Sequence, residues 1–273
     1  MHGFLVLPAA GYLIWCRRRE WMPLVPTPNS IALVMLMPLG VIWFVGEVTS
    51  LIWLQQIAVV AMLPTLAWVV LGNDIVRILA WPLGFLMFMI PVGTSLDPWL
   101  QDITARFIEG GLELSGIPYL YKGRQFVLTS GAWDVAPDCG GLRYLLPGLA
   151  LGYAYVTLLY RKPSRRFAFL LLCAVVLMVA NGIRAFAIII GDHYGIAEGA
   201  DHRLFSYSIY GLTMPLLFWW GLKWEERPEK GLPLPVGESR YCFDTHKPIR
   251  MAIIAVTILA VAPISAWLWI GLP

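Results

Sequence analysis

The chain has 273 residues, of which 59% are hydrophobic and only 14% are charged, and its formal net charge is +3. Soluble domains carry about 25% charged residues, so this composition excludes an ordinary soluble protein. It predicts an all-α polytopic membrane protein in which residues 1–273 form a single transmembrane domain, and we expect no nucleic-acid partner.

Several apolar runs of about 17 to 24 residues lack interior charges and are long enough to cross a bilayer. Together with shorter or singly charged runs they predict about eight spans. We expect spans at residues 2–16, 30–46, 51–72, 75–93, 140–160, 167–190, 203–221 and 250–270. Asn73-Asp74 is expected to form the turn between the third and the fourth of them.

Clusters of basic residues set the expected orientation of these spans. Arg17-Arg18-Arg19 follow the first apolar run, which is the reverse of a signal peptide, where positive charge comes first. The densest basic run lies at residues 161–166. Because cytoplasmic loops are enriched in Lys and Arg, we expect both clusters in the cytoplasm. Alternation then puts residues 94–138 and 191–201 on the outer side.

The first half of the 94–138 stretch is predicted to be an amphipathic helix that lies on the membrane surface and ends near Gly110-Gly111 or Gly116. Its apolar positions at helical spacing are Leu96, Trp99, Leu100, Ile103, Phe107 and Ile108, and the polar positions are Asp97, Gln101, Asp102, Arg106 and Glu109.

A short β-hairpin is expected in the second half of this stretch. Tyr119–Tyr121 and Gln125–Thr129 are rich in strand-forming residues and flank Lys122-Gly123-Arg124, which suits a turn. A further extended piece at residues 132–135 leads into Pro137.

Cys139 follows Asp138 and precedes Gly140 and Gly141 at the expected start of a span. The N-terminus of a helix carries partial positive charge and unpaired N–H groups, which favour the reactive thiolate. The two glycines allow a substrate to approach the backbone closely. The alternative interpretation is a small buried hydrophobic residue at a helix start.

The other three cysteines are expected away from the outer side. Cys16 closes the first apolar run, Cys173 lies within a span, and Cys242 lies in a loop that we place in the cytoplasm. Cys139 is thus expected to have no disulfide partner on the outer side.

Arg184 lies within an apolar run, about 9 Å from the expected outer end of its helix at about 1.5 Å per residue. An arginine inside a span is costly and indicates function. It is a candidate to stabilise an oxyanion or to bind a substrate carboxylate. The alternative is that it snorkels to the headgroups. Asn181, one turn earlier, shares its face and either orients Arg184 or supports helix packing.

Asp201 and His202 stand at the expected start of the next span. Imidazole takes up and returns a proton near neutral pH, so His202 is a candidate acid and base, or else an interfacial polar residue. His193, beside Asp192, competes for this role, but we expect it in a glycine-rich loop that holds its position poorly.

A metal site would have to combine Cys139, His193, His202 and an aspartate. No pair of these ligands has the close spacing of a structural or protease zinc site, so we expect no metal and no cofactor. Secondary candidates for the site are Asp138, Arg143, Tyr207 and Tyr210. Arg143 lies one turn past the thiol, where it either lowers the pKa of the thiol or contacts lipid headgroups.

Three short motifs occur in order at expected helix ends. They are Cys139-Gly140-Gly141-Leu142-Arg143, Asn181-Gly182-Ile183-Arg184 and Asp201-His202-Arg203-Leu204-Phe205. With these residues the chain resembles the exosortase/archaeosortase family of membrane cysteine transpeptidases, and within it the exosortase A group. The likeness covers nearly the whole chain. One difference is Gly140, where the family commonly has Ser, and it alters the local hydrogen bonding.

The resemblance implies a protease or transpeptidase that acts on PEP-CTERM-type proteins, which carry a C-terminal Pro-Glu-Pro motif, a membrane helix and a basic tail. It implies a multi-pass protein of the bacterial inner membrane whose active site faces the periplasm among membrane lipids. The sorted proteins are linked to exopolysaccharide, and their transfer acceptor is unknown.

The resemblance also implies that Cys139 is the nucleophile, His202 the acid and base, and Arg184 the oxyanion or substrate stabiliser. Residues expected to bind substrate or to support these three are Asp138, Gly140, Gly141, Arg143, Asn181 and Asp201. A non-catalytic scaffold or a transporter component of exopolysaccharide assembly is the alternative function. A scaffold needs no cysteine, and a transporter needs a polar path across the membrane, which the sequence does not show.

Overall fold

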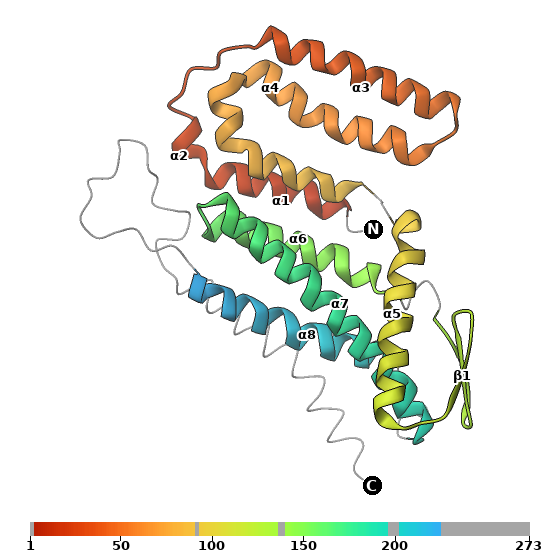
Figure 1. Ribbon diagram of the computed structural model, residues 1–273. Coiled ribbons are helices and arrows are strands. Elements are labelled where there is room, and N and C mark those ends of the chain that lie inside the picture. Colours follow the sequence, from red (N-terminus) through yellow and green to blue (C-terminus); the bar gives the residue numbers. More distant parts are fainter. Residues whose placement is uncertain (1–2, 91–92, 136–139, 196–201, 225–273) are drawn as a thin grey trace. The chain divides into compact units, whose positions relative to one another are not determined.

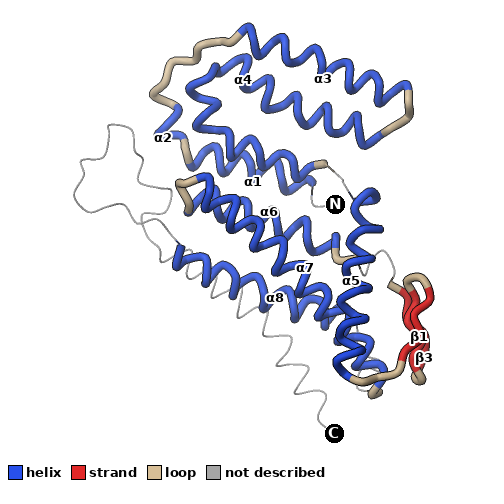
Figure 2. The backbone as a smooth tube through the Cα atoms, viewed as in Figure 1, coloured by secondary structure: helices blue, strands red, loops and turns tan. Residues whose placement is uncertain are grey.

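A computed structural model of the chain describes residues 3–90, 93–135, 140–195 and 202–224. Within these ranges the protein is mostly helical and has one small antiparallel sheet (Figure 1, Figure 2). The described residues divide into two compact units. The first holds residues 3–90 and 153–162, and the second holds residues 93–135, 140–152, 163–195 and 202–224.

The first unit consists of an N-terminal helix and a long helical hairpin. Its elements are α1 (Gly3–Cys16), α2 (Arg18–Trp21), α3 (Ser30–Val48), α4 (Ile52–Gly84) and the short 3₁₀ helix η1 (Phe85–Met89). The helix α3 runs side by side with the first half of α4 (Figure 1). Asn29 caps α3, because its side-chain oxygen accepts a 2.9 Å hydrogen bond from the backbone N–H of Ile31.

A sharp bend inside α4 takes the place of the turn that we expected at Asn73-Asp74. Gly72 has φ 81° and ψ −177°, while the residues on both sides of it are helical. A Cβ added at Gly72 would lie 2.0 Å from the carbonyl oxygen of Thr27, so only glycine fits. Beyond the bend, α4 and η1 pack along α1 (Figure 1). The expected spans 51–72 and 75–93 are therefore joined through a kink and not through a loop.

The second unit contains the sheet and the remaining helices. Its elements are α5 (Gly93–Ser115), β1 (Tyr119–Lys122), β2 (Gln125–Leu128), β3 (Gly131–Asp134), α6 (Leu142–Leu159), α7 (Pro163–His193), α8 (His202–Gly221) and the short η3 (Leu222–Trp224). The end of α6 belongs to the first unit. The helix α7 packs against both α5 and α8, and these two contacts make it the central helix of the unit (Figure 1).

Glycines allow these helices to approach one another closely. A Cβ added at Gly182 of α7 would lie 2.4 Å from Cγ of Phe107 on α5. One added at Gly148 of α6 would lie 2.6 Å from Cδ1 of Leu177 on α7. Close packing across small residues is the usual way in which helices associate in a membrane.

The predicted hairpin is confirmed, and a third strand extends it. The sheet has the order β1-β2-β3 and is antiparallel throughout, with Lys122 opposite Gln125 at the Gly123 turn. Exposed and buried residues alternate along β2. Phe126 and Leu128 therefore face a core that the sheet shares with α5 and α7, where it contacts residues such as Ile108.

The helix α5 ends at Ser115, and Gly116 follows with φ 66°, which is the conformation of a glycine that terminates a helix. Its buried positions include two polar side chains, Gln101 and Thr104. Trp99, which we placed on the apolar face, is exposed, because the face that points to α7 and the sheet is the one that is buried.

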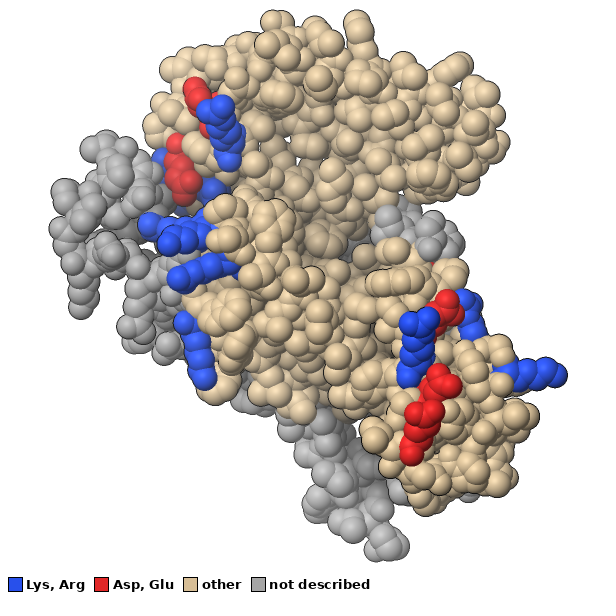
Figure 3. Space-filling view, viewed as in Figure 1, with Lys and Arg blue, Asp and Glu red and all other residues tan. Residues whose placement is uncertain are grey.

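Four helices in the described part of the chain are long and apolar enough to cross a membrane. They are Ser30–Val48, Ile52–Met89, Leu142–Leu159 and Pro163–His193. The surface over α3 shows no charged side chains on the face drawn in Figure 3, as suits contact with lipid. Of the other expected spans, the first contains the shorter apolar helix Val6–Cys16, the seventh begins with α8, and residues 250–270 lie outside the described residues.

Candidate active site

The backbone directly before α6 contacts the side chain of Asn181. Gly140, Gly141 and Leu142 are buried. Gly141 has φ 83°, and a Cβ added to it would lie 2.4 Å from Cγ of Asn181. The backbone at Gly141 therefore lies directly against the carboxamide, and a larger residue would displace one of the two.

Asn181 connects three helices of the second unit. Its side chain is 3% exposed, and its Nδ2 donates a 3.0 Å hydrogen bond to Oγ1 of Thr104 on α5. The hydroxyl of Tyr210 on α8 donates to Oδ1 of Asn181 at 3.1 Å. Thr104 in turn donates to the carbonyl oxygen of Leu100 at 2.9 Å. A buried carboxamide is stable only when such partners satisfy it.

Arg184 lies one turn further along α7 and is also buried, with 6% of its surface exposed. Its Cζ lies 5.6 Å from the ring centroid of Tyr144 on α6. Tyr144 stacks on Tyr210, with ring centroids 4.2 Å apart and planes 15° from parallel. A cation near the face of an aromatic ring is attracted to it. The burial of Arg184 is opposite to what snorkelling to lipid headgroups requires.

The face of α7 that Asn181 and Arg184 share is buried, as the spacing predicted. Ala180, Asn181, Arg184 and Ala185 are all buried, while Ile183 is 47% exposed. The structure therefore brings together Gly141, Asn181 and Arg184 from the expected site. Arg143 lies on the exposed side of α6.

Several expected site residues lie outside the described residues. These are Asp138, Cys139 and Asp201. His202 is the first residue of α8, and its backbone position is described, whereas its side chain and that of Tyr207 are not. The contacts of the expected nucleophile and of the expected acid and base therefore stay predictions.

His193 is not in a loop, and the expectation that its position is poorly fixed is wrong. The helix α7 continues to His193, its last residue. The Nδ1 atom of His193 lies 2.6 Å from Oγ of Ser130, and Trp133 Nε1 donates to Oδ2 of Asp192 at 3.1 Å. Contacts with the sheet thus hold the end of α7 and extend the helix past the glycine at position 191.

Thr104 and Tyr144 belong to the cluster, and sequence reasoning did not single them out. Thr104 follows Leu100 and precedes Ile108 by one turn each, and these two flanking residues are buried. A polar residue on an apolar helical stripe is a signal that it has a buried partner. Tyr144 carries no comparable signal, because aromatic residues are frequent in membrane helices.

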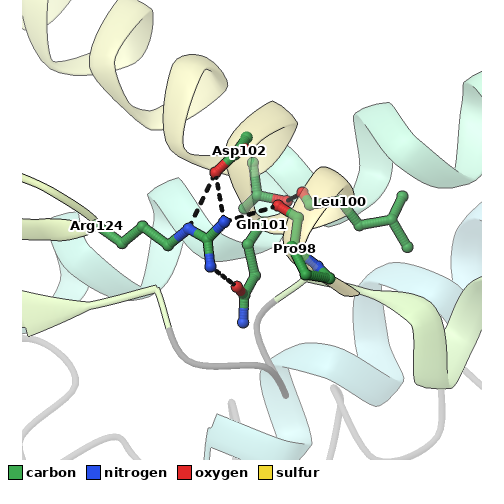
Figure 4. Close-up of polar contacts among 6 residues, drawn as sticks. Pro98, Leu100, Gln101, Asp102 and Arg124 are labelled. Atoms are coloured by element: carbon green, nitrogen blue, oxygen red, sulfur yellow. Dashed lines mark hydrogen bonds and ion pairs between the residues drawn. The ribbon is translucent and has the colours of Figure 1, made fainter. Parts of the chain in front are cut away.

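Arg124, at the β1–β2 turn, holds the sheet against the start of α5 (Figure 4). Its Nε donates to Oδ1 of Asp102 at 2.9 Å, its Nη2 donates to the carbonyl oxygen of Pro98 at 3.1 Å, and its Nη1 donates to the side chain of Gln101. The pair with Asp102 is solvent-exposed, so it contributes orientation more than stability.

At the other end of the same helix, Tyr119 meets two carboxylates. Its hydroxyl donates to Glu113 at 3.3 Å and to Glu109 at 3.5 Å. Desolvation, followed by the negative charges of Glu113 and Glu109, raises the pKa of Tyr119 above its ordinary value. Tyr119 therefore stays neutral and donates at physiological pH.

The described residues contain no group of three or more His, Cys, Asp or Glu side chains that would hold a metal ion. Cys173 on α7 is fully buried, and a Cβ added at Gly152 would lie 2.9 Å from its sulfur. Its thiol fills space between α6 and α7, which is a packing role.

Long apolar helices around a buried arginine and asparagine and a stacked tyrosine pair define a multi-pass helical membrane protein with a polar interior cluster. A protein-family model described as transmembrane exosortase (Exosortase_EpsH) matches residues 1–219. The chain therefore belongs to the transmembrane exosortase family, whose members are generally cysteine transpeptidases that sort PEP-CTERM proteins. The match carries no evidence for exosortase A specifically. No curated protein and no solved structure matches the chain.

Proposed function

We propose that this protein is a membrane-embedded cysteine protease or transpeptidase of the bacterial inner membrane, most like exosortase A. It cleaves the C-terminal PEP-CTERM-type signals of exported proteins at the periplasmic face, within a pathway that sorts exopolysaccharide-associated proteins. The observation that carries the proposal is the contact between two of the three motifs. Gly141 lies against Asn181, and Arg184 is buried one turn away.

His202, in the third motif, is the first residue of α8, which runs antiparallel to α7 (Figure 1). The contact between Tyr210 and Asn181 fixes the register of the two helices. His202 precedes Tyr210 by about two turns, and Arg184 follows Asn181 by about one. Both therefore lie on the same side of this contact along the helix axes. Gly141, directly before α6 and two residues after Cys139 in the chain, meets α7 at Asn181, the same residue that Tyr210 contacts.

In this proposal the Cys139 thiolate attacks the carbonyl carbon of the bond to be cleaved. Arg184 stabilises the negative charge that develops on the carbonyl oxygen. His202 gives a proton to the leaving amine, and a thioester remains on Cys139. An acceptor nucleophile or water then loses a proton to His202 and attacks the thioester carbonyl carbon. The carbon–sulfur bond breaks, and the Cys139 thiolate and the protonated His202 are restored. The reaction follows the scheme of proteases in which a histidine exchanges protons for a cysteine nucleophile, here on a helical scaffold.

The test uses a reporter protein that ends in a Pro-Glu-Pro motif, an apolar helix and a basic tail. Cys139→Ala and Cys139→Ser are expected to abolish its processing while the protein still accumulates in the membrane. Cys16→Ser, Cys173→Ser and Cys242→Ser are the matched controls and are expected to process the reporter. Normal processing by Cys139→Ala would rule out covalent thiol catalysis.

Two further measurements bear on the same proposal. A covalent adduct between Cys139 and the reporter, sensitive to hydroxylamine and seen by mass spectrometry, would identify the thioester. Topology reporters fused within residues 94–138 are expected to behave as periplasmic. If they behave as cytoplasmic, the proposed orientation of the site is wrong.

A further inference from the structure

We propose that Thr104 and Tyr210 are positioning residues, which lock the Asn181 carboxamide in one orientation beneath Gly141 and so fix the start of α6. The inference rests on the proposed function insofar as it links this lock to turnover. It concerns residues outside the three motifs, on helices α5 and α8.

The hydrogen bonds of Asn181 with Thr104 and Tyr210 have one consistent direction. The hydroxyl proton of Thr104 is used by the carbonyl oxygen of Leu100, so its oxygen accepts from Asn181 Nδ2. Asn181 Oδ1 is then left to accept from the hydroxyl of Tyr210. A carboxamide has one donor side and one acceptor side. Thr104 and Tyr210 together therefore allow one of its two flipped orientations and disfavour the other.

The position of this carboxamide matters because the backbone of Gly141 packs directly against it. All three terminal atoms of Asn181 lie within 2.7 Å of the place where a Cβ on Gly141 would be. Rotation of the carboxamide therefore pushes the backbone at Gly141. Cys139 precedes Gly141 by two residues, so the chain allows at most about 7 Å between their Cα atoms. Fixing the orientation of the Asn181 side chain therefore also restricts the position of the segment that contains Cys139.

Tyr210 also bears on the position of Arg184. Tyr210 stacks on Tyr144, and the guanidinium of Arg184 faces the Tyr144 ring. The hydroxyl of Tyr210 thus ties the aromatic pair to Asn181, one turn from the arginine. Four helices meet here, so a loosened bond would shift the thiol and the guanidinium relative to each other.

Thr104→Val removes the hydroxyl with little change in shape, and Thr104→Ser restores it. Thr157→Val is the matched control. Thr157 is 4% exposed against 3% for Thr104, and its hydroxyl also donates to the carbonyl four residues back, at 2.7 Å. Tyr210→Phe keeps the stacked ring and loses only the bond to Asn181. All variants are made in the full chain and assayed in membranes with the reporter.

Thr104→Val and Tyr210→Phe are expected to lower kcat about tenfold or more while KM stays unchanged, since misplacement of reacting groups slows chemistry. Thr104→Ser and Thr157→Val are expected to keep normal kcat. Equal kcat for Thr104→Val and Thr157→Val, or a loss confined to accumulation in the membrane, would overturn the inference, because it would show a merely structural role.

A second readout does not depend on processing. The rate at which iodoacetamide alkylates Cys139, followed by peptide mass, is expected to fall in Thr104→Val and to recover in Thr104→Ser. If Cys139→Ala still processes the reporter, the proposed function fails, and the alkylation rates alone decide the positioning role. If Cys139→Ala is inactive and these rates do not differ between Thr104→Val and Thr157→Val, only the positioning role fails.

Discussion

The helices α4 and α7 are similar in length and in apolar character, but they differ in what surrounds them. Both are long enough to cross a membrane, with 33 and 31 residues. In the most apolar stretch of α7, 44% of the residues are buried, against 11% in the most apolar stretch of the helix Ile52–Met89, which contains α4. Each belongs to a different compact unit.

The polar residues of the two helices differ in burial in the same way. Arg77 on α4 is exposed, whereas Arg184 and Asn181 on α7 are buried among side chains of three other helices. A buried polar group in a membrane is costly unless partners satisfy it. The comparison therefore shows that α7 contains a buried and hydrogen-bonded polar face, while α4 is mainly apolar and bends at Gly72.

The sharpest test of this comparison replaces one arginine on each helix. Arg184→Lys is expected to lower processing of the reporter by about 10²–10³-fold, because lysine keeps the charge but loses the planar set of donors. Arg77→Lys is expected to process normally. Initial rates in membranes with matched protein amounts measure both. Near-normal rates for Arg184→Lys would indicate that the guanidinium has no catalytic contact.

The next test replaces a glycine with positive φ on each side of the comparison. Gly141→Ala is expected to lower processing per folded molecule about tenfold or more, because its Cβ displaces the Asn181 carboxamide. Gly72→Ala is expected to lower the amount of folded protein, since its Cβ collides with Thr27, but to leave the rate per folded molecule unchanged. Equal rates per folded molecule in both variants would contradict the assignment of Gly141 to the site.

A smaller effect is expected on stability. Gly182→Ala forces a Cβ against the Phe107 ring and is expected to destabilise the second unit by about 1–3 kcal/mol. Gly40→Ala on α3 has no atom within 4 Å of the new Cβ and is expected to stabilise its helix by up to about 1 kcal/mol. Thermal unfolding in detergent compares the two. A neutral Gly182→Ala would show that α5 and α7 are less closely packed than the contact indicates.

The smallest effect is expected at the end of α7. His193→Ala removes the contact with Ser130 and is expected to cost about 0.5–1.5 kcal/mol of stability, while most of the processing remains. His202→Ala is the comparison and is expected to lose processing. If the two outcomes are reversed, His193 is the acid and base, and its anchored position on α7 is the reason.

Element types in this protein were predictable because they depend on local patterns. The span at 30–46 and the hairpin around Gly123 agree with the structure, and so does Gly116, the second of the two expected helix ends. The bend at Gly72 was displaced by one residue from the expected turn, because a contact with Thr27 selects that glycine. The anchored end of α7 was missed, because its partners Ser130 and Trp133 lie on the sheet.

By itself, the sequence determined which stretches are apolar enough to be spans, which side of them is basic, and that one face of α7 carries Asn181 and Arg184. These properties follow from composition and from the 3.6-residue period of a helix. Only the tertiary structure decided which residues form hydrogen bonds with the polar side chains of that face. Asn181 bonds to Thr104, 77 residues away, and to Tyr210, 29 residues away. Partners at such distances in the chain meet only through helix packing, which no local pattern encodes.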